Sequence, residues 1–222
     1  MERNKRKRIQ LIHTGLEFKM GYAKNWLTKE EWKRLKKAPT KKKERGDYKY
    51  KPELKKWRDE LLIRTMYYGG LRVSEALDLQ YPYNFSTSDG NGYIILYGKK
   101  QKDGEEEKQK QPAKHELVRD VGNFMTAFHE EKETNYIFEI HRSTAYSIVK
   151  EMGDYADIDK KISNHTLRRT RALHLIESGQ MDLSQVSRFL RHKRVETTME
   201  YLDFATKDLA DIVNKIDEEN DL

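Results

Sequence analysis

What this sequence lacks already limits its class. Its 222 residues include no cysteine, which excludes disulfides and thiolate metal sites. No run of apolar residues approaches the length that spans a membrane, and the first residues, M-E-R-N-K-R-K-R, lack the apolar core of a secretion signal. We therefore expect a soluble protein that works in the cytoplasm.

Apolar residues are also scarce. Hydrophobic residues make up 36% of the chain and charged residues another 36%, which is unusually polar for a compact domain. A chain of this length can bury one substantial core or two small ones. We infer that part of the chain is an extended or partner-dependent arm outside the core.

Positive charge is concentrated in the first part of the chain. Residues 1–66 hold 22 lysines and arginines against 9 aspartates and glutamates, a formal charge of +13. Residues 67–222 hold 22 against 28, a formal charge of −6. The basic part favours a polyanionic partner such as DNA, and a lysine-rich surface that is merely solvated is the plain alternative.

Residues 1–26 carry only a weak apolar scatter after a cationic run, so we expect a basic N-terminal arm or a partial helix there. A compact domain should begin directly after them. Thr28 and Glu31 have the spacing of a capping box, and Leu27 and Trp32 are placed for a hydrophobic staple around it. These signals predict the start of the first helix.

Hydrophobic spacing predicts helices around one small sheet of three strands. Pro52 fits the first position of a helix that Gly69-Gly70 ends, and Arg72 begins a short helix. The period then changes to that of strands joined by glycine turns. Strands are predicted over residues 80–85, 93–97 and about 108–111. Further helices are predicted over residues 115–128, 143–155 and 183–192, with Ser143 as the cap of the second. Another helix is expected to begin at about residue 165, and a last one after Phe204.

Residues suited to phosphate chemistry gather toward the end of the chain. His165 and Arg168 fall on the apolar stripe of a helix, so we expect both side chains on its inward face. His192 follows a short amphipathic helix, and Tyr201 lies nine residues further on. Arginine holds a phosphate through two parallel charge-assisted hydrogen bonds. Tyrosine, with an ordinary pKa of about 10, attacks phosphorus once a base or nearby cations favour the phenolate.

These residues, together with G-L-R-V-S-E at residues 70–75 and Gly98-Lys99, resemble the catalytic domain of the tyrosine recombinases, the phage and archaeal integrase family. The family pattern is an arginine in G-L-R-x-S-E, a lysine in a hairpin, H-x-x-R, L-G-H, and a tyrosine nine residues on. The resemblance implies six catalytic residues: Arg72, Lys99, His165, Arg168, His192 and Tyr201. One departure is Arg191, which stands where the family usually has glycine and bears on the tightness of the turn before His192.

The resemblance also implies a mechanism. The two arginines grip the scissile phosphate, and the later histidine donates a further hydrogen bond to it. The tyrosine attacks phosphorus to give a 3′-phosphotyrosyl link, the lysine protonates the departing 5′ oxygen, and the earlier histidine orients or deprotonates the nucleophile. This chemistry uses neither a metal nor a nucleotide cofactor.

The resemblance covers about residues 27–222 and implies a mostly helical α+β fold that acts on double-stranded DNA as a homo-oligomer, a tetramer, with no membrane involved. The C-terminal helix would cover its own core or dock on a neighbouring protomer. Family members usually carry a further N-terminal helical domain, for which residues 1–26 leave no room. We therefore expect either a catalytic domain alone or a minimal recombinase, encoded by a virus or another mobile element.

Several alternatives stay open. Spacing does not separate Lys99 from Lys100 or Lys102, and Arg169 lies one turn from the same histidine as Arg168, so only the resemblance selects among them. A type IB topoisomerase would use much the same chemistry to relax DNA without choosing a site. A non-catalytic DNA-binding regulator would account for the basic part of the chain alone.

Overall fold

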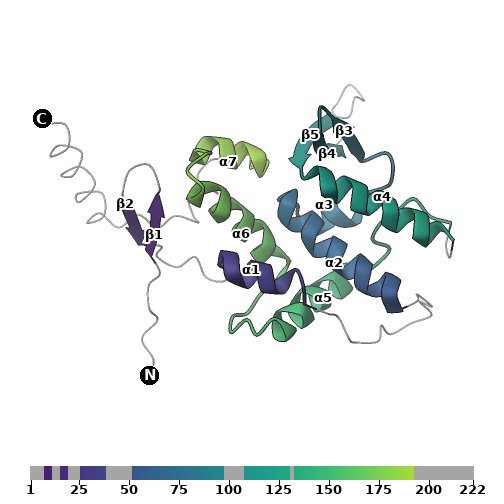
Figure 1. Cartoon of the computed structure of the whole chain (residues 1–222), viewed down its shortest axis with the longest axis horizontal. Coiled ribbons are helices and arrows are strands. Elements are labelled where there is room, and N and C mark those ends of the chain that lie inside the picture. Colours follow the sequence, from purple (N-terminus) through teal and green to yellow (C-terminus); the bar gives the residue numbers. More distant parts are fainter. Residues whose placement is uncertain are drawn as a thin grey trace, which may run out of the picture. The chain divides into compact units, whose positions relative to one another are not determined.

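The computed structural model describes residues 8–11, 16–19, 26–38, 52–97, 108–130 and 133–192. The chain, whose elements are drawn in Figure 1, divides into two compact units, residues 27–168 in one and residues 1–26 with 169–222 in the other. Each unit has a hydrophobic core of its own. Among the described helices, none is both long enough and apolar enough to cross a membrane.

The larger unit is built around the long helix α2 (Pro52–Tyr68). Helix α4 (His115–His129) packs along α2 and on a small sheet, and α5 (Arg142–Tyr155) contacts α2, α1 (Lys29–Leu35) and the short α3 (Val73–Leu77) (Figure 1). The core between these elements contains fully buried side chains, among them Leu61, Leu62, Ile63, Met66, Val121 and Phe128. The mostly helical α+β fold class predicted from the sequence is confirmed.

The sheet of this unit has three antiparallel strands, β3 (Phe85–Ser88), β4 (Asn91–Tyr97) and β5 (Lys108–Ala113), in the order β3-β4-β5. A two-residue turn joins β3 to β4. Its residues Asp89 and Gly90 both have positive φ, 52° and 75°, which is the conformation that matches the twist of paired strands. The predicted three-stranded sheet is therefore present, with a tighter first turn than expected.

The prediction of a strand over residues 80–85 is wrong for all but the last residue. The side chain of Asn84 accepts a hydrogen bond from the backbone N–H of Gln80 at 2.7 Å and donates one to the carbonyl of Ile95 at 2.6 Å. Such local side-chain bonds offer the backbone an alternative to strand pairing. Strand β3 therefore begins only at Phe85, and Gln80 forms an isolated bridge to Tyr136 instead.

The described part of the N-terminal segment is a β-hairpin, which corrects the expectation of a partial helix. Strands β1 (Arg8–Leu11) and β2 (Leu16–Lys19) pair antiparallel, with Ile9 opposite Phe18. The apolar residues of both strands alternate with polar ones, the period of a strand. Ile12, directly after β1, interrupts this alternation in the sequence and hides it.

The start of α1 confirms the predicted capping box. The hydroxyl of Thr28 accepts a hydrogen bond from the N–H of Glu31 at 3.2 Å, and the Glu31 carboxylate accepts one from the N–H of Thr28 at 2.7 Å. Leu27 and Trp32, the predicted staple residues, are both buried. Lys160 adds an ion pair to the Glu31 carboxylate at 2.6 Å, which joins α1 to the segment just after α5.

The prediction that Ser143 caps α5 is wrong. The helix begins at Arg142, and His141 is its N-cap residue, with no hydrogen bond from its side chain to the helix. His141 has the extended backbone of an N-cap, φ −72° and ψ 154°. Ser143 therefore already lies inside the first turn, where its side chain is exposed.

Helix α6 (Asn164–Glu177) begins in the larger unit and continues into the smaller one, where α7 (Leu183–Phe189) follows it. Asp182 caps α7 by accepting a hydrogen bond from the N–H of Gln185 at 2.7 Å. The core of the smaller unit is formed by Ala172, Val186 and Leu190, with Leu175, Ile176, Met181 and Phe189 packed against them. The predicted helix after Phe204 lies outside the described residues.

Candidate active site

The end of α2 sets the position of the first arginine. Gly70 has φ 57°, its N–H donates to the carbonyl of Tyr67 at 3.1 Å, and the N–H of Leu71 donates to the carbonyl of Met66 at 2.9 Å. This pair of hydrogen bonds terminates a helix at a residue in the left-handed backbone conformation. Glycine is favoured at such a position because it has no Cβ to clash with the backbone. Since Leu71 is fully buried, the direction of the chain into Arg72 is fixed.

Glu75 holds both the backbone and the side chain of Arg72. Its Oε2 accepts a hydrogen bond from the Arg72 backbone N–H at 2.7 Å, which helps to start α3. Its Oε1 accepts one from Arg72 Nη1, also at 2.7 Å. The Arg72 side chain is 42% exposed, against 23% for Glu75, so the guanidinium is accessible although it is held in place.

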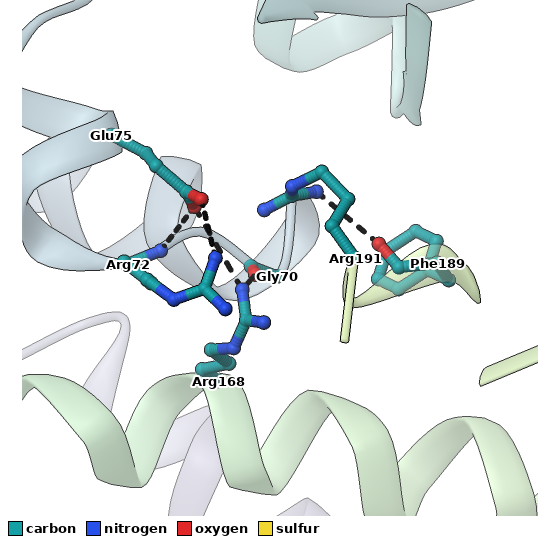
Figure 2. A network of polar contacts seen from close by, with 6 residues as sticks. All are labelled: Gly70, Arg72, Glu75, Arg168, Phe189 and Arg191. Carbon is teal, nitrogen blue, oxygen red and sulfur yellow. Dashed lines mark hydrogen bonds and ion pairs between the residues drawn. The ribbon is translucent and has the colours of Figure 1, made fainter. Parts of the chain in front are cut away.

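Arg168, from the first turns of α6, reaches the same carboxylate. Its Nη1 donates to the carbonyl of Gly70 at 2.6 Å, across 98 positions of sequence, and lies 3.8 Å from Glu75 Oε2. The side chain is only 4% exposed, and a buried guanidinium requires such acceptors. Figure 2 shows the guanidiniums of Arg72 and Arg168 both directed toward Glu75. Two arginines that are distant in the sequence therefore converge on one carboxylate.

The charge balance of this group favours an anion. Two guanidiniums held close together repel each other, and the carboxylate of Glu75 lies against both. These three side chains together carry two positive charges and one negative charge, and they combine one buried and one accessible guanidinium. A phosphodiester carries one negative charge and oxygens that match the guanidinium fork. The geometry is therefore suited to hold a single phosphate of a nucleic-acid backbone.

His165 lies in the first turn of α6, one turn before Arg168. Its side chain is exposed, so the expectation of an inward-facing position is wrong for His165, whereas Arg168 is buried. The helix start explains the difference. Asn164, Thr166 and Leu167 are the residues buried in the first turn, and the Thr166 hydroxyl accepts a hydrogen bond from the N–H of Ser163 at 3.0 Å.

The structure distinguishes the two adjacent arginines that sequence spacing leaves equivalent. Arg168 is buried and bonds to the carbonyl of Gly70, whereas Arg169 is partly exposed. The hundred-degree step between successive helical residues turns them in different directions. In the larger unit it is thus Arg168 that shares Glu75 with Arg72.

The remaining candidates are not brought into this group by the described structure. Lys99, its alternatives Lys100 and Lys102, and Tyr201 lie outside the described residues. His192 belongs to the smaller unit, where it lies three residues after the last residue of α7. It is partly exposed, and its N–H donates to the carbonyl of Ser187 at 3.1 Å.

The sequence-based prediction assigned no function to two parts of the site, the Glu75 carboxylate and the carbonyl of Gly70. Glu75 is in the quoted motif, and its spacing from Arg72 is that of a capping box, which would have been a usable signal. The carbonyl of Gly70 has no sequence signal, because it depends on how α6 packs against the end of α2. Within the described ranges, no three His, Asp or Glu side chains are grouped so that they would hold a metal ion.

Comparisons with known proteins identify the family of this chain. The model of the phage integrase family matches residues 25–207. A tyrosine recombinase of Pseudothermotoga lettingae is 32% identical over 168 residues, covering 73% of this chain and 55% of its own. The tyrosine recombinase XerD of Neisseria meningitidis serogroup A is 34% identical over 173 residues, covering 71% of this chain and 54% of its own.

Solved structures show the same fold. The XerH site-specific recombinase, bound to its difH substrate, has a TM-score of 0.65 at 20% identity over 84% of this chain and 52% of that one. The XerA recombinase has a TM-score of 0.61 at 20% identity over 86% of this chain and 64% of that one. The chain belongs to the phage integrase family, the tyrosine recombinases. It spans about half the length of the curated relatives it matches.

Proposed function

We propose that this chain carries the catalytic centre of a site-specific DNA recombinase that cuts and rejoins DNA strands through a 3′-phosphotyrosyl intermediate. The observation that carries the proposal is the convergence of Arg72 and Arg168 on Glu75, with Arg168 also bonded to the carbonyl of Gly70. In a member of the phage integrase family, a pair of arginines fixed in this way is suited to the scissile phosphate.

The arginine pair acts on the transition state. When a nucleophile attacks the phosphodiester, negative charge builds up on the non-bridging oxygens, and donors already aimed at them stabilise that charge without reorganising. Arg72 is held by Glu75 and Arg168 by Gly70, so the two forks need little further ordering when DNA binds. His192 donates a further hydrogen bond to the same oxygens.

The bonds and protons of DNA cleavage and rejoining are all accounted for without a cofactor. The phenolic oxygen of Tyr201 forms a bond to phosphorus while the bond to the 5′ oxygen breaks, and Lys99 gives that oxygen its proton. His165 orients the phenol or takes its proton. One phosphate diester replaces another of similar energy, so the free 5′ hydroxyl of a partner strand can reverse the step and rejoin DNA without ATP.

The proposed substrate is double-stranded DNA, and the proposed assembly on it is a tetramer. The XerH structure with the same fold is a complex with its DNA substrate, and a lambda integrase structure with a TM-score of 0.54 is a dimer bound to a core site; these support the proposal. We further propose that residues 27–222 form the catalytic domain, that residues 1–26 form a basic arm on DNA, and that the C-terminal helix docks on a neighbouring protomer. We place the protein in the cytoplasm, associated with DNA, in the host cell of a mobile element.

A covalent capture experiment tests the proposal and selects the target sequence in the same step. The protein is incubated with a pool of nicked duplexes of randomised sequence, in which the cleaved fragment diffuses away and traps the intermediate. Adducts that survive denaturation are isolated, and their DNA is sequenced. Tyr201→Phe should abolish the adduct and leave DNA binding nearly intact, because only the hydroxyl is lost.

The matched control is Tyr155→Phe, which removes the hydroxyl of an exposed tyrosine of α5 and should leave the adduct unchanged. An adduct that persists in Tyr201→Phe would assign the nucleophile to another residue. Enrichment of one target sequence supports a recombinase. Adducts without sequence preference, together with relaxation of supercoiled DNA, would instead indicate a topoisomerase.

A further inference from the structure

Arg191 has a backbone conformation that arginine rarely adopts. Its φ is 57°, its N–H donates to the carbonyl of Arg188 at 3.0 Å, and the N–H of His192 donates to the carbonyl of Ser187 at 3.1 Å. These are the same two hydrogen bonds that end α2 at Gly70. The position strongly favours glycine, because the Cβ of an L-residue crowds its own backbone there.

The end of helix α5 also has a residue other than glycine in the left-handed conformation. Helix α5 ends on Asp157, with φ 51° and the equivalent hydrogen bonds, from Asp157 to Asp154 at 3.3 Å and from Ile158 to Gly153 at 3.1 Å. Aspartate is among the few residues that enter this region readily, since its short polar side chain bonds locally. Arginine has no such side chain, so Arg191 requires another explanation.

Capping of its own helix does not explain Arg191. Its Nη1 donates to the carbonyl of Phe189 at 3.2 Å (Figure 2). Phe189 is only partly buried, and water serves a last-turn carbonyl at such a place about as well. A cation near a helix C-terminus is favourable, yet Arg188 already supplies one in the last turn of α7.

The sequence around Arg191 is cationic. Residues 188–194, R-F-L-R-H-K-R, hold four lysines and arginines, one histidine and no acidic residue. Arg171 of α6 adds a guanidinium at the same helix end, with its Cζ 5.7 Å from the centroid of the Phe189 ring. A run of like charges of this kind favours an anionic partner.

We propose that Arg191 binds a DNA phosphate adjacent to the one that His192 contacts. The inference rests on the proposed function, which makes the bound anion a nucleic-acid backbone. The left-handed turn fixes the point at which the side chain leaves the backbone next to His192. A guanidinium can keep one hydrogen bond to a carbonyl and still donate a parallel pair to phosphate oxygens. Arginine at this position therefore lowers the stability of the fold and raises its affinity for DNA.

The test compares Arg191→Gly with the unchanged protein in melting and in DNA binding, using nicked duplexes from the covalent capture. Glycine relieves the backbone strain, so the melting temperature should rise by about 2–4 °C. Loss of the phosphate contact should weaken DNA binding about tenfold and reduce the slope of log affinity against log salt by about 0.9. Arg191→Gln, which keeps a side chain in the strained turn, should show the same loss of binding with no gain in melting temperature.

Two controls separate strain from charge. Asp157→Gly makes the same backbone change at the end of α5, where the strain is smaller, and should raise the melting temperature less than Arg191→Gly without weakening DNA binding. Arg188→Gln removes an exposed arginine of the same helix and should have a clearly smaller effect on affinity. Unchanged affinity and salt slope in Arg191→Gly would overturn the inference, as would equal losses in Arg188→Gln and Arg191→Gln.

Failure of this inference is distinguishable from failure of the proposed function. If the unchanged protein forms no covalent adduct with any duplex, the recombinase mechanism is wrong. If it forms the adduct while Arg191→Gly binds and cleaves the same DNA equally well, only the role of Arg191 is wrong.

Discussion

The carboxylate that joins the two arginines provides the sharpest test of how the site is held together. Glu75→Gln keeps the size of the side chain and one carbonyl oxygen for the Arg72 backbone N–H, but it removes the charge. Glu75 Oε2 lies 3.8 Å from Arg168 Nη1, where unit charges interact by about 4 kcal/mol at an effective dielectric constant of 20. Because Glu75 is partly exposed, we expect a smaller loss of about 1–2 kcal/mol in unfolding free energy.

This loss corresponds to a fall in melting temperature of about 2–8 °C for a chain of this size. The assay is thermal unfolding followed by circular dichroism, paired with the rate of adduct formation, which should fall about tenfold or more as the guanidiniums separate. Glu60→Gln is the matched control, since Glu60 is 40% exposed and pairs with Arg64 at 3.5 Å. If Glu75→Gln melts and cleaves like Glu60→Gln, the carboxylate does not organise the site.

Three further predictions concern the same geometry and the basic segment. Arg168→Lys should slow cleavage by about 100-fold or more, because a point ammonium cannot replace a bidentate fork, whereas Arg169→Lys should do much less; equal rate constants would remove the distinction. Gly70→Ala should lower the unfolding free energy by about 1–2 kcal/mol in urea titrations, because alanine is strained at φ 57°, and an unchanged midpoint would contradict that turn. Removing residues 1–25, which keeps Trp26, should flatten the salt dependence of DNA affinity and spare cleavage of saturated DNA, whereas a lower melting temperature with an unchanged slope would mean that the segment only packs on the protein.

Local signals in the sequence predicted much of the fold. The capping box at Thr28, the proline at the start of α2 and the glycine pair at its end each act through the backbone of a few neighbouring residues. Such interactions are almost independent of the tertiary structure. They were therefore predicted correctly from the sequence alone.

Errors arose where two local signals competed. Ser143 is a good cap residue by type, yet α5 starts one residue before it because His141 takes the extended conformation. Residues 80–85 have the composition of a strand, but the hydrogen bonds of Asn84 hold most of them in a loop. The N-terminal hairpin was missed because one additional apolar residue, Ile12, broke the alternation.

The site shows a similar division. The motif pattern selects Arg72 and Arg168 but does not show how they meet, since the carbonyl of Gly70 and the carboxylate of Glu75 become partners of Arg168 only when α6 lies near the end of α2. The glycine position filled by Arg191 was visible as a departure from the family pattern. Its left-handed backbone became apparent only from the hydrogen bonds at the end of α7.

The most direct measurement is the identity of the residue that becomes covalently attached to DNA. The trapped adduct is digested with protease and nuclease, and the peptide that carries the residual nucleotide is sequenced by mass spectrometry. The account predicts a single modified peptide, with the phosphate on the oxygen of Tyr201 and joined to the 3′ end of the cleaved strand. A phosphate on another residue, or a link to the 5′ end, would contradict it.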